Sequence, residues 1–152
     1  MLDRRECVAR SAALAAALAG FGLLPPAARA AWPKAAFEAK GLGEVVKALG
    51  GAAPSASKEV TLTGPDIAED GAAVQLSFGS SLPGVQRLAL LVERNPFTLA
   101  AVFELGAGVV PVNLSTRLKM GESSNVYAVA FLGDGRVLYA VKDIRVTLSG
   151  CG

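Results

Sequence analysis

From residue 59 onward the chain is a series of short runs rich in apolar and β-branched residues, each followed by residues that favour turns. The runs cover residues 59–63, 73–78, 87–93, 98–105, 109–118, 125–132 and 137–148, and the last is long enough for two strands. The breaks between them include Gly64-Pro65-Asp66, Asn95-Pro96 and Asp134-Gly135. This pattern predicts a mainly β chain, folded as an antiparallel β-sandwich of the immunoglobulin-like type, with an open barrel as the competing architecture.

One segment before the strands has helical periodicity instead. Apolar residues at Phe37, Leu42, Val45, Val46 and Leu49 recur at a spacing close to 3.6, which predicts one helix from residue 33 to residue 49. Proline near its start and the pair Gly50-Gly51 at its end agree with these bounds. We therefore expect an N-terminal helix within residues 31–51, a linker over 52–58 as the first part of a β-sandwich domain spanning 52–148, and a C-terminal arm of residues 149–152.

Two of the predicted strands, residues 88–92 and 126–132, are apolar on both faces. A strand in a free-standing sandwich normally turns one face to water and alternates accordingly. A second cover is therefore expected on these strands. It could be the N-terminal helix or another protein subunit, and because one helix can hardly cover both strands, a partner is the favoured interpretation.

Residues 1–30 have the features of an export signal. Arg4 and Arg5 precede an apolar run over 11–24, which is followed by a Pro-Pro pair and by Ala28-Arg29-Ala30, where cleavage after Ala30 fits the small-x-small rule. The apolar run has about 14 residues, short of the roughly 20 that a permanent transmembrane helix needs, so no mature membrane anchor is expected. The paired arginines favour the twin-arginine route to the periplasm, with an ordinary secretory leader as the alternative.

Charge and composition exclude several classes of function. Four of the 15 basic residues and two of the 13 acidic ones lie in the leader, so residues 31–152 are neutral overall and offer no basic face for nucleic acid. The chain has no histidine, which excludes a Ser/His/Asp triad or a histidine-based zinc site. The acidic residues Asp66, Glu69 and Asp70 are interpreted as a solvated loop rather than as a cation site. No metal site or cofactor is predicted.

The C-terminal residues carry the clearest chemical signal. Cys7 leaves with the leader, so Cys151 is the one thiol of the mature chain and cannot form an internal disulfide. If the last strand ends near Leu148, the four residues that follow can carry the thiol up to about 13 Å beyond the domain. Gly150 and Gly152 flank the cysteine and leave the backbone unrestricted. The terminal carboxylate disfavours the thiolate, so we expect partner active sites, not this chain, to activate Cys151.

Together these features resemble the SoxY family, the sulfur-carrier subunits of the periplasmic thiosulfate-oxidising system. The resemblance rests on the twin-arginine leader, the helix ending in Gly-Gly, the β-sandwich, and the Gly-Cys-Gly arm that follows a strand ending in Ile144-Arg145-Val146-Thr147. The family usually ends in Gly-Gly-Cys-Gly-Gly. Here Ser149 replaces the first glycine and the sequence stops one glycine early, which bears on the reach of the arm into partner enzymes.

The resemblance implies a carrier that catalyses nothing itself. Cys151 would be the point of covalent substrate attachment, and Ser149, Gly150 and Gly152 would form its swinging arm. The implied partners are a second β-sandwich subunit, SoxZ, which has no signal of its own, a c-type cytochrome complex that joins thiosulfate to the thiol, a manganese hydrolase that removes sulfate, and a molybdenum and haem dehydrogenase that oxidises the remaining sulfur.

Two other functions fit parts of the sequence. A structural or adhesion-type β-sandwich could use Cys151 for a disulfide between chains. A thiol oxidoreductase is disfavoured because the mature chain has neither a resolving cysteine nor an obvious base.

Overall fold

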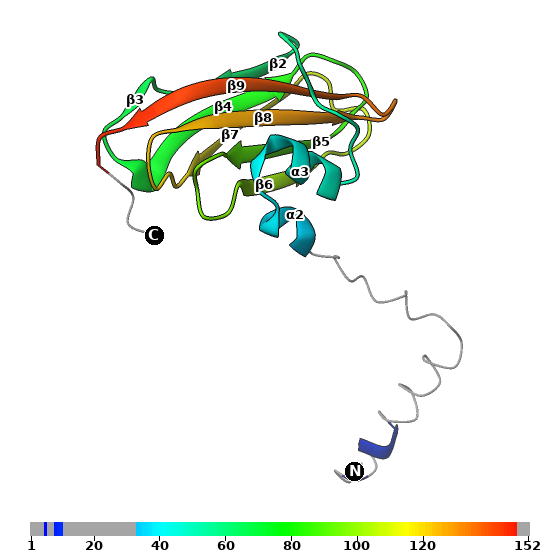
Figure 1. Cartoon of the computed structure of the whole chain (residues 1–152). Helices are drawn as coiled ribbons and strands as arrows, with labels where there is room; N and C mark the ends of the chain where they lie inside the picture. Colours follow the sequence, from blue (N-terminus) through cyan, green and yellow to red (C-terminus); the bar gives the residue numbers. More distant parts are fainter. Residues whose placement is uncertain (1–4, 6–7, 11–32, 149–152) are drawn as a thin grey trace. The chain divides into compact units, whose positions relative to one another are not determined.

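The strands expected from the sequence pair into two sheets that face each other in a computed structural model, which describes residues 5, 8–10 and 33–148 (Figure 1). In chain order the elements of residues 33–148 are α2 (Lys34–Glu38), α3 (Gly41–Ala48), β1 (Ser55–Ala56), β2 (Val60–Thr63), β3 (Ile67–Ala68), a 3₁₀ turn η1 (Gly71–Ala73), β4 (Val74–Ser80), β5 (Val85–Val92), β6 (Leu99–Glu104), β7 (Val112–Leu118), β8 (Ser124–Leu132) and β9 (Val137–Val146).

The larger sheet has the order β1-β9-β8-β5-β6 and the smaller one the order β2-β4-β7. The long strands pair antiparallel, while β1 and β3 add two-residue parallel pairings to the outer edge of β9. Alternate side chains of β5 and β8, among them Leu88, Leu90, Ala128 and Ala130, are fully buried together with Phe78 of β4 between the two sheets. The predicted mainly β sandwich is therefore confirmed.

Most of the predicted strands begin and end within two residues of their predicted bounds. The clearest exception is β7, which begins at Val112 because residues 109–111 lie in an exposed loop that ends in a proline, a residue without a backbone N–H. The run over 137–148 is one strand, since β9 pairs continuously with β8 from Val137 to Ile144. The predicted linker contains β1, which pairs with the first half of β9.

The single helix predicted over residues 33–49 is instead two short helices, so that expectation was wrong. Ala39 and Lys40 are extended between them, and α3 starts at Gly41, whose φ of 78° is unstrained only for glycine. The break is capped, because the Lys40 backbone N–H donates to the Glu44 carboxylate at 3.1 Å. Among the described residues, no helix combines the length and hydropathy that crossing a membrane requires.

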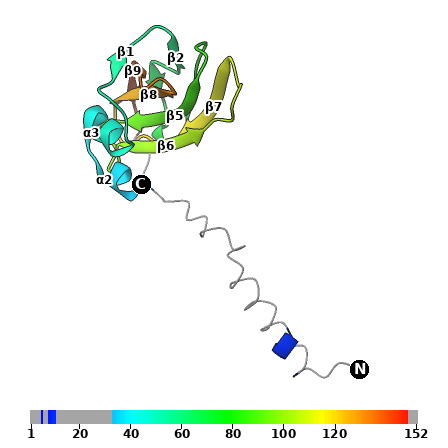
Figure 2. The same ribbon diagram turned by 90° about the vertical axis from the view of Figure 1, so that its right-hand side faces the viewer.

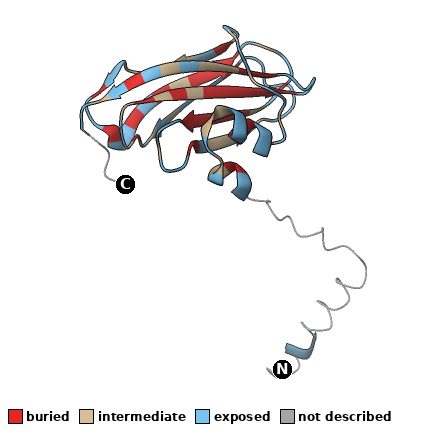
Figure 3. Ribbon diagram, in the orientation of Figure 1, coloured by how far each residue is buried: buried red, intermediate tan, exposed pale blue. Residues whose placement is uncertain are grey.

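The two helices lie on the outer face of the larger sheet, opposite β7, as Figure 2 shows. Val45, Val46 and Leu49 are buried there against alternate side chains of the central strands, including Ala89 and Val129. The other face of the same strands is buried by the smaller sheet, and Figure 3 shows this band of buried residues along β5 and β8. The expectation that a partner covers these strands was wrong, because a helix pair and a sheet within the chain cover both faces.

Candidate functional site

The residues predicted to form the carrier arm, Cys151 with Ser149, Gly150 and Gly152, lie outside the described residues. The structure does describe the segment from which they extend. We call residues Val146, Thr147 and Leu148 the arm root. It follows directly on β9, at the end of that strand which lies beside β3 (Figure 1).

One side of the arm root is held by the segment around β3 and η1. The Thr147 backbone N–H donates to the carbonyl of Ala68 at 3.0 Å, and the backbone N–H of Gly71 donates to the carbonyl of Leu148 at 2.9 Å. The Thr147 hydroxyl donates to the carbonyl of Glu69 at 3.1 Å. The chain is therefore fixed by backbone hydrogen bonds as far as Leu148, four residues from its end.

The other side of the arm root is held by the loop between β7 and β8. The Ser123 hydroxyl oxygen accepts from the Val146 backbone N–H at 2.8 Å. The same loop is tied to η1, since the N–H of the buried residue Met120 donates to the carbonyl of Gly71 at 2.8 Å. Three segments that are far apart in the sequence thus converge on the last residues of β9.

An ion pair supports the β3 side. The Lys142 ammonium lies 2.6 Å from an Asp66 carboxylate oxygen, and the N–H of Arg145 donates to the Asp66 carbonyl. The hydrogen bond from Lys142 and its positive charge lower the pKa of Asp66 from the usual aspartate value. Asp70 accepts from the Ala72 N–H at 2.8 Å and so begins η1. Within the described part of the chain no three His, Cys, Asp or Glu side chains are grouped so as to hold a metal ion.

A polar cavity of about 290 Å³ adjoins the arm root. It is lined by Glu93, Arg94, Ser123, Ser124, Asn125, Asp143 and Arg145. Two cations and two carboxylates balance within it, and the Asn125 amide donates to Glu93 at 3.0 Å. The arm root therefore has a polar cavity on one side, while Val146 packs against the buried apolar cluster that includes Met120 and Ile144.

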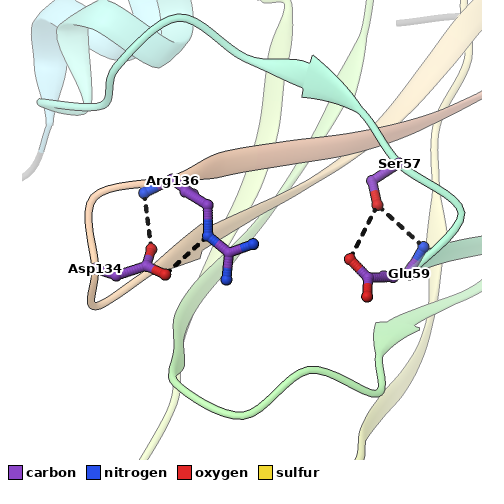
Figure 4. A network of polar contacts seen from close by, with 4 residues as sticks. All are labelled: Ser57, Glu59, Asp134 and Arg136. Carbon is purple, nitrogen blue, oxygen red and sulfur yellow. Dashed lines mark hydrogen bonds and ion pairs between the residues drawn. The ribbon is translucent and has the colours of Figure 1, made fainter.

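At the opposite end of β9, the polar side-chain contacts join residues that are close in sequence. In the β8–β9 turn the Asp134 carboxylate accepts from the backbone and side chain of Arg136, which lowers the pKa of Asp134. Nearby, the Ser57 hydroxyl donates to Glu59 and accepts from the Glu59 N–H in the turn before β2 (Figure 4). These contacts shape tight turns, and they place no second cluster of reactive groups at that end.

The described geometry is that of a fixed anchor for a short tether. Cys151 is the third residue after Leu148, a distance of at most about 11 Å along extended chain. The sequence predicts the tether and its thiol, which lie outside the described residues. It did not identify Ser123, Asp66 or Gly71 as anchors, because each resembles an ordinary turn residue until the fold brings it beside β9.

Comparison with known proteins gives a family match that includes the arm. The model of the family described as sulfur oxidation protein SoxY matches residues 45–151, which cover the second half of α3, both sheets and the cysteine at 151. No curated protein sequence matches the chain.

Solved structures give a consistent result. The sulfur carrier protein SoxY from Chlorobium limicola f thiosulfatophilum is 26% identical, with a TM-score of 0.61 over 68% of this chain and 93% of that chain. The superoxide reductase (neelaredoxin) from Ignicoccus hospitalis is 18% identical, with a TM-score of 0.51 over 57% of this chain and 78% of that chain. At that identity the second likeness concerns the sandwich fold alone.

Proposed function

The chain belongs to the SoxY family of sulfur oxidation proteins, and from this premise we propose that it carries thiosulfate-derived sulfur covalently on Cys151. Family membership, together with the likeness to a sulfur carrier of known structure, supports the carrier role. The position of Cys151 supports it as the attachment residue. It is the one cysteine downstream of the leader, and it lies inside the region that the family model matches.

The attachment step is an oxidation. The thiol of Cys151 and the terminal sulfur of thiosulfate form an S–S bond, the thiol loses its proton, and two electrons pass to a partner c-type cytochrome. The product is a cysteine S-thiosulfonate. Hydrolysis by a partner enzyme then releases sulfate, with water supplying the oxygen, and leaves a persulfide on Cys151 for a dehydrogenase to oxidise further.

The chain's own contribution to these steps is physical. The hydrogen bonds at Ala68, Gly71 and Ser123 fix the arm root, so that only the residues beyond Leu148 need to enter a partner's active site. A covalent tether keeps the sulfur species at high effective concentration and prevents its diffusion between enzymes. The carrier then needs no base or metal of its own, and each partner supplies the catalytic groups.

Family membership also suggests the cellular compartment and the binding partners of this protein. Sox-system proteins act in the periplasm, and a leader with Arg4 and Arg5 supports export of the chain by the twin-arginine route. We propose that it travels folded, in complex with a signal-less β-sandwich subunit of the SoxZ type, and that the cytochrome, manganese hydrolase and molybdenum and haem dehydrogenase are its successive partners.

Substitution of the thiol tests the proposal. The exported protein is isolated from cells oxidising thiosulfate, and its C-terminal peptide is weighed without reduction. We expect a mass increase of one S₂O₃ unit, or of sulfur atoms, on the unsubstituted peptide and none in Cys151→Ser, which should also stop thiosulfate consumption. The matched control is Cys7→Ser in the leader, which should change neither. Unchanged thiosulfate consumption in Cys151→Ser would refute the carrier role, and a disulfide-linked dimer as the sole native form would favour a structural one.

A further inference from the structure

The sandwich is open along one side. Among the described strands, β6 pairs only with β5 and β7 only with β4, so each of the two sheets has an unpaired edge on this side (Figure 2). Backbone N–H and C=O groups along such an edge are a template for another strand. Natural edges are usually protected by lysine, proline or a bulky cover, whereas the only charged residue within β6 is Glu104 at its end. We call the space between these two strands the β6–β7 opening.

An apolar cavity of about 550 Å³ lies at one end of the β6–β7 opening. Its lining includes Leu99 and Ala101 of β6 and Leu118 of β7, together with Phe97, whose side chain is 62% exposed. An exposed phenylalanine beside an unpaired strand is costly in water and is typical of a surface that a partner covers. The cavity therefore has both the apolar lining and the backbone groups that an added strand would use.

The charge of the cavity is one-sided. Arg117 and Lys119 are among its lining residues, and no carboxylate is. The Arg117 Nε donates to the Gln75 side chain at 3.0 Å, which holds the guanidinium beside β4 of the smaller sheet. An occupant with apolar side chains and a carboxylate fits this lining, because the carboxylate would balance the positive charge of Arg117 and Lys119.

Two other occupants fit less well. Residues 149–152 contain no apolar side chain larger than cysteine, too little to fill such a volume. A second copy of the chain, paired through β6, would offer only Ala100 and Glu104 as exposed side chains of that strand. The terminal residues therefore supply no large apolar group, and a second copy could offer the cavity only its own Phe97.

We propose that the β6–β7 opening is a docking surface for a partner protein that adds an extended, apolar and acidic strand to the edge of β6. This inference rests on the proposed function, from which it takes the partner to be the second β-sandwich subunit. Neither Ser123, Gly71 nor any residue of the arm root is among those that line the cavity. The lining residue Lys119 does precede Met120, which binds Gly71, so a subunit docked here would lie next to the anchor of the arm without covering its hydrogen bonds.

The test measures the affinity of the full chain for the purified second subunit. Phe97→Ser removes the exposed aromatic ring and Arg117→Glu reverses the cavity charge, and each is expected to raise Kd about tenfold or more. Arg117→Lys should recover part of the loss. The matched control is Val141→Ser, which removes another half-exposed apolar side chain, on β9, and should leave Kd unchanged.

A second measurement does not depend on substitutions. Hydrogen exchange of residues 99–104 should slow on binding of the subunit, while residues 55–58, beside the other edge of the sheet, should exchange as before. The proposal would be overturned by an unchanged Kd in both opening variants or by a loss of affinity confined to Val141→Ser. It would also be overturned if a second copy of the chain protected residues 99–104, or if the unsubstituted chain formed no complex with the subunit. The mass of the Cys151 peptide in the same samples reports separately on the carrier function.

Discussion

At the residue scale, the proposed site combines the thiol of Cys151 with a few polar groups that hold the arm root. The thiol of Cys151 needs no neighbours if partner enzymes supply the catalysis. The arm root does need neighbours, because the backbone groups of the last residues of β9 would otherwise lack partners. Those partners come from two segments: Ala68 and Gly71 from the segment around β3 and η1, and Ser123 from the loop between β7 and β8.

The Ser123 hydroxyl is predicted to secure the arm root. Ser123→Ala leaves the half-buried Val146 N–H without its acceptor, so we expect a loss of about 1 kcal/mol in the free energy of unfolding. Chemical denaturation measures the loss, and hydrogen exchange at residues 146–148 should become faster. Ser57→Ala, which removes an exposed hydroxyl at the other end of β9, is the control and should have a smaller effect. Equal stability of Ser123→Ala and the unsubstituted chain would contradict this role.

The ion pair between Asp66 and Lys142 predicts a pH dependence of stability. Because the pKa of Asp66 is lowered in the folded chain, its stabilisation is fully present above the unfolded value of about 3.9 and is lost as pH falls through the folded pKa. The difference in stability between the unsubstituted chain and Lys142→Met should therefore be constant near neutral pH and shrink below about pH 4. Unfolding curves recorded across this range test it, with Lys58→Met, an exposed lysine, as control. A difference that persists at the lowest pH would exclude the ion pair as its cause.

At the element scale, close approach of backbones decides where side chains can be tolerated. Gly79 of β4 lies opposite Asn113 of β7, and a Cβ there would overlap the Val112 carbonyl and lie 3.0 Å from the Asn113 Cα. Neither neighbour can move without separating the two strands. The glycine is therefore required by the spacing of the smaller sheet, which the local sequence does not reveal.

We predict opposite effects for alanine at two glycines. Gly79→Ala should destabilise the fold by about 3 kcal/mol, because the added methyl group forces β4 and β7 apart. Gly43→Ala in α3 meets nothing within 4 Å and should stabilise by up to about 1 kcal/mol, because alanine restricts the unfolded chain and favours the helix. Denaturant titrations of the two variants measure both signs. Equal effects at the two positions would contradict the close contact assigned to Gly79.

At the scale of the whole molecule, residues 33–148 form three layers, a helix pair and two sheets. The short helices are too short to be stable alone, and their buried side chains Val45 and Val46 hold them to the sheet. Arg87 contributes from the sheet, since its guanidinium donates to the Leu49 carbonyl at 2.9 Å and lies 4.7 Å from the centre of the Phe131 ring. Both faces of the central strands are therefore buried within one chain.

This layering predicts that the chain folds without its second subunit. Residues 31–152 purified alone should unfold in a single cooperative transition. Its midpoint should be the same whether unfolding is followed by circular dichroism or by tyrosine fluorescence. These residues should keep a near-ultraviolet circular dichroism signal in native buffer, which reports fixed packing of the aromatic side chains. Loss of that signal or a missing transition would mean that the core needs a partner to complete it.

The sequence by itself determined the mainly β sandwich, the glycine stop after the helical segment and the position of the thiol near the end of the chain, because periodicity, turn chemistry and cysteine count are local properties. The tertiary structure alone decided what covers Leu91 and Val129, where the helix breaks, and which groups hold the arm root. Those outcomes depend on distant segments meeting: Gly41 breaks a helix that then fits the sheet, and Ser123 binds Val146 only because β8 and β9 are neighbours. The hydrophobic pattern of a strand predicts that a face is buried, but it does not indicate which element of the fold covers that face.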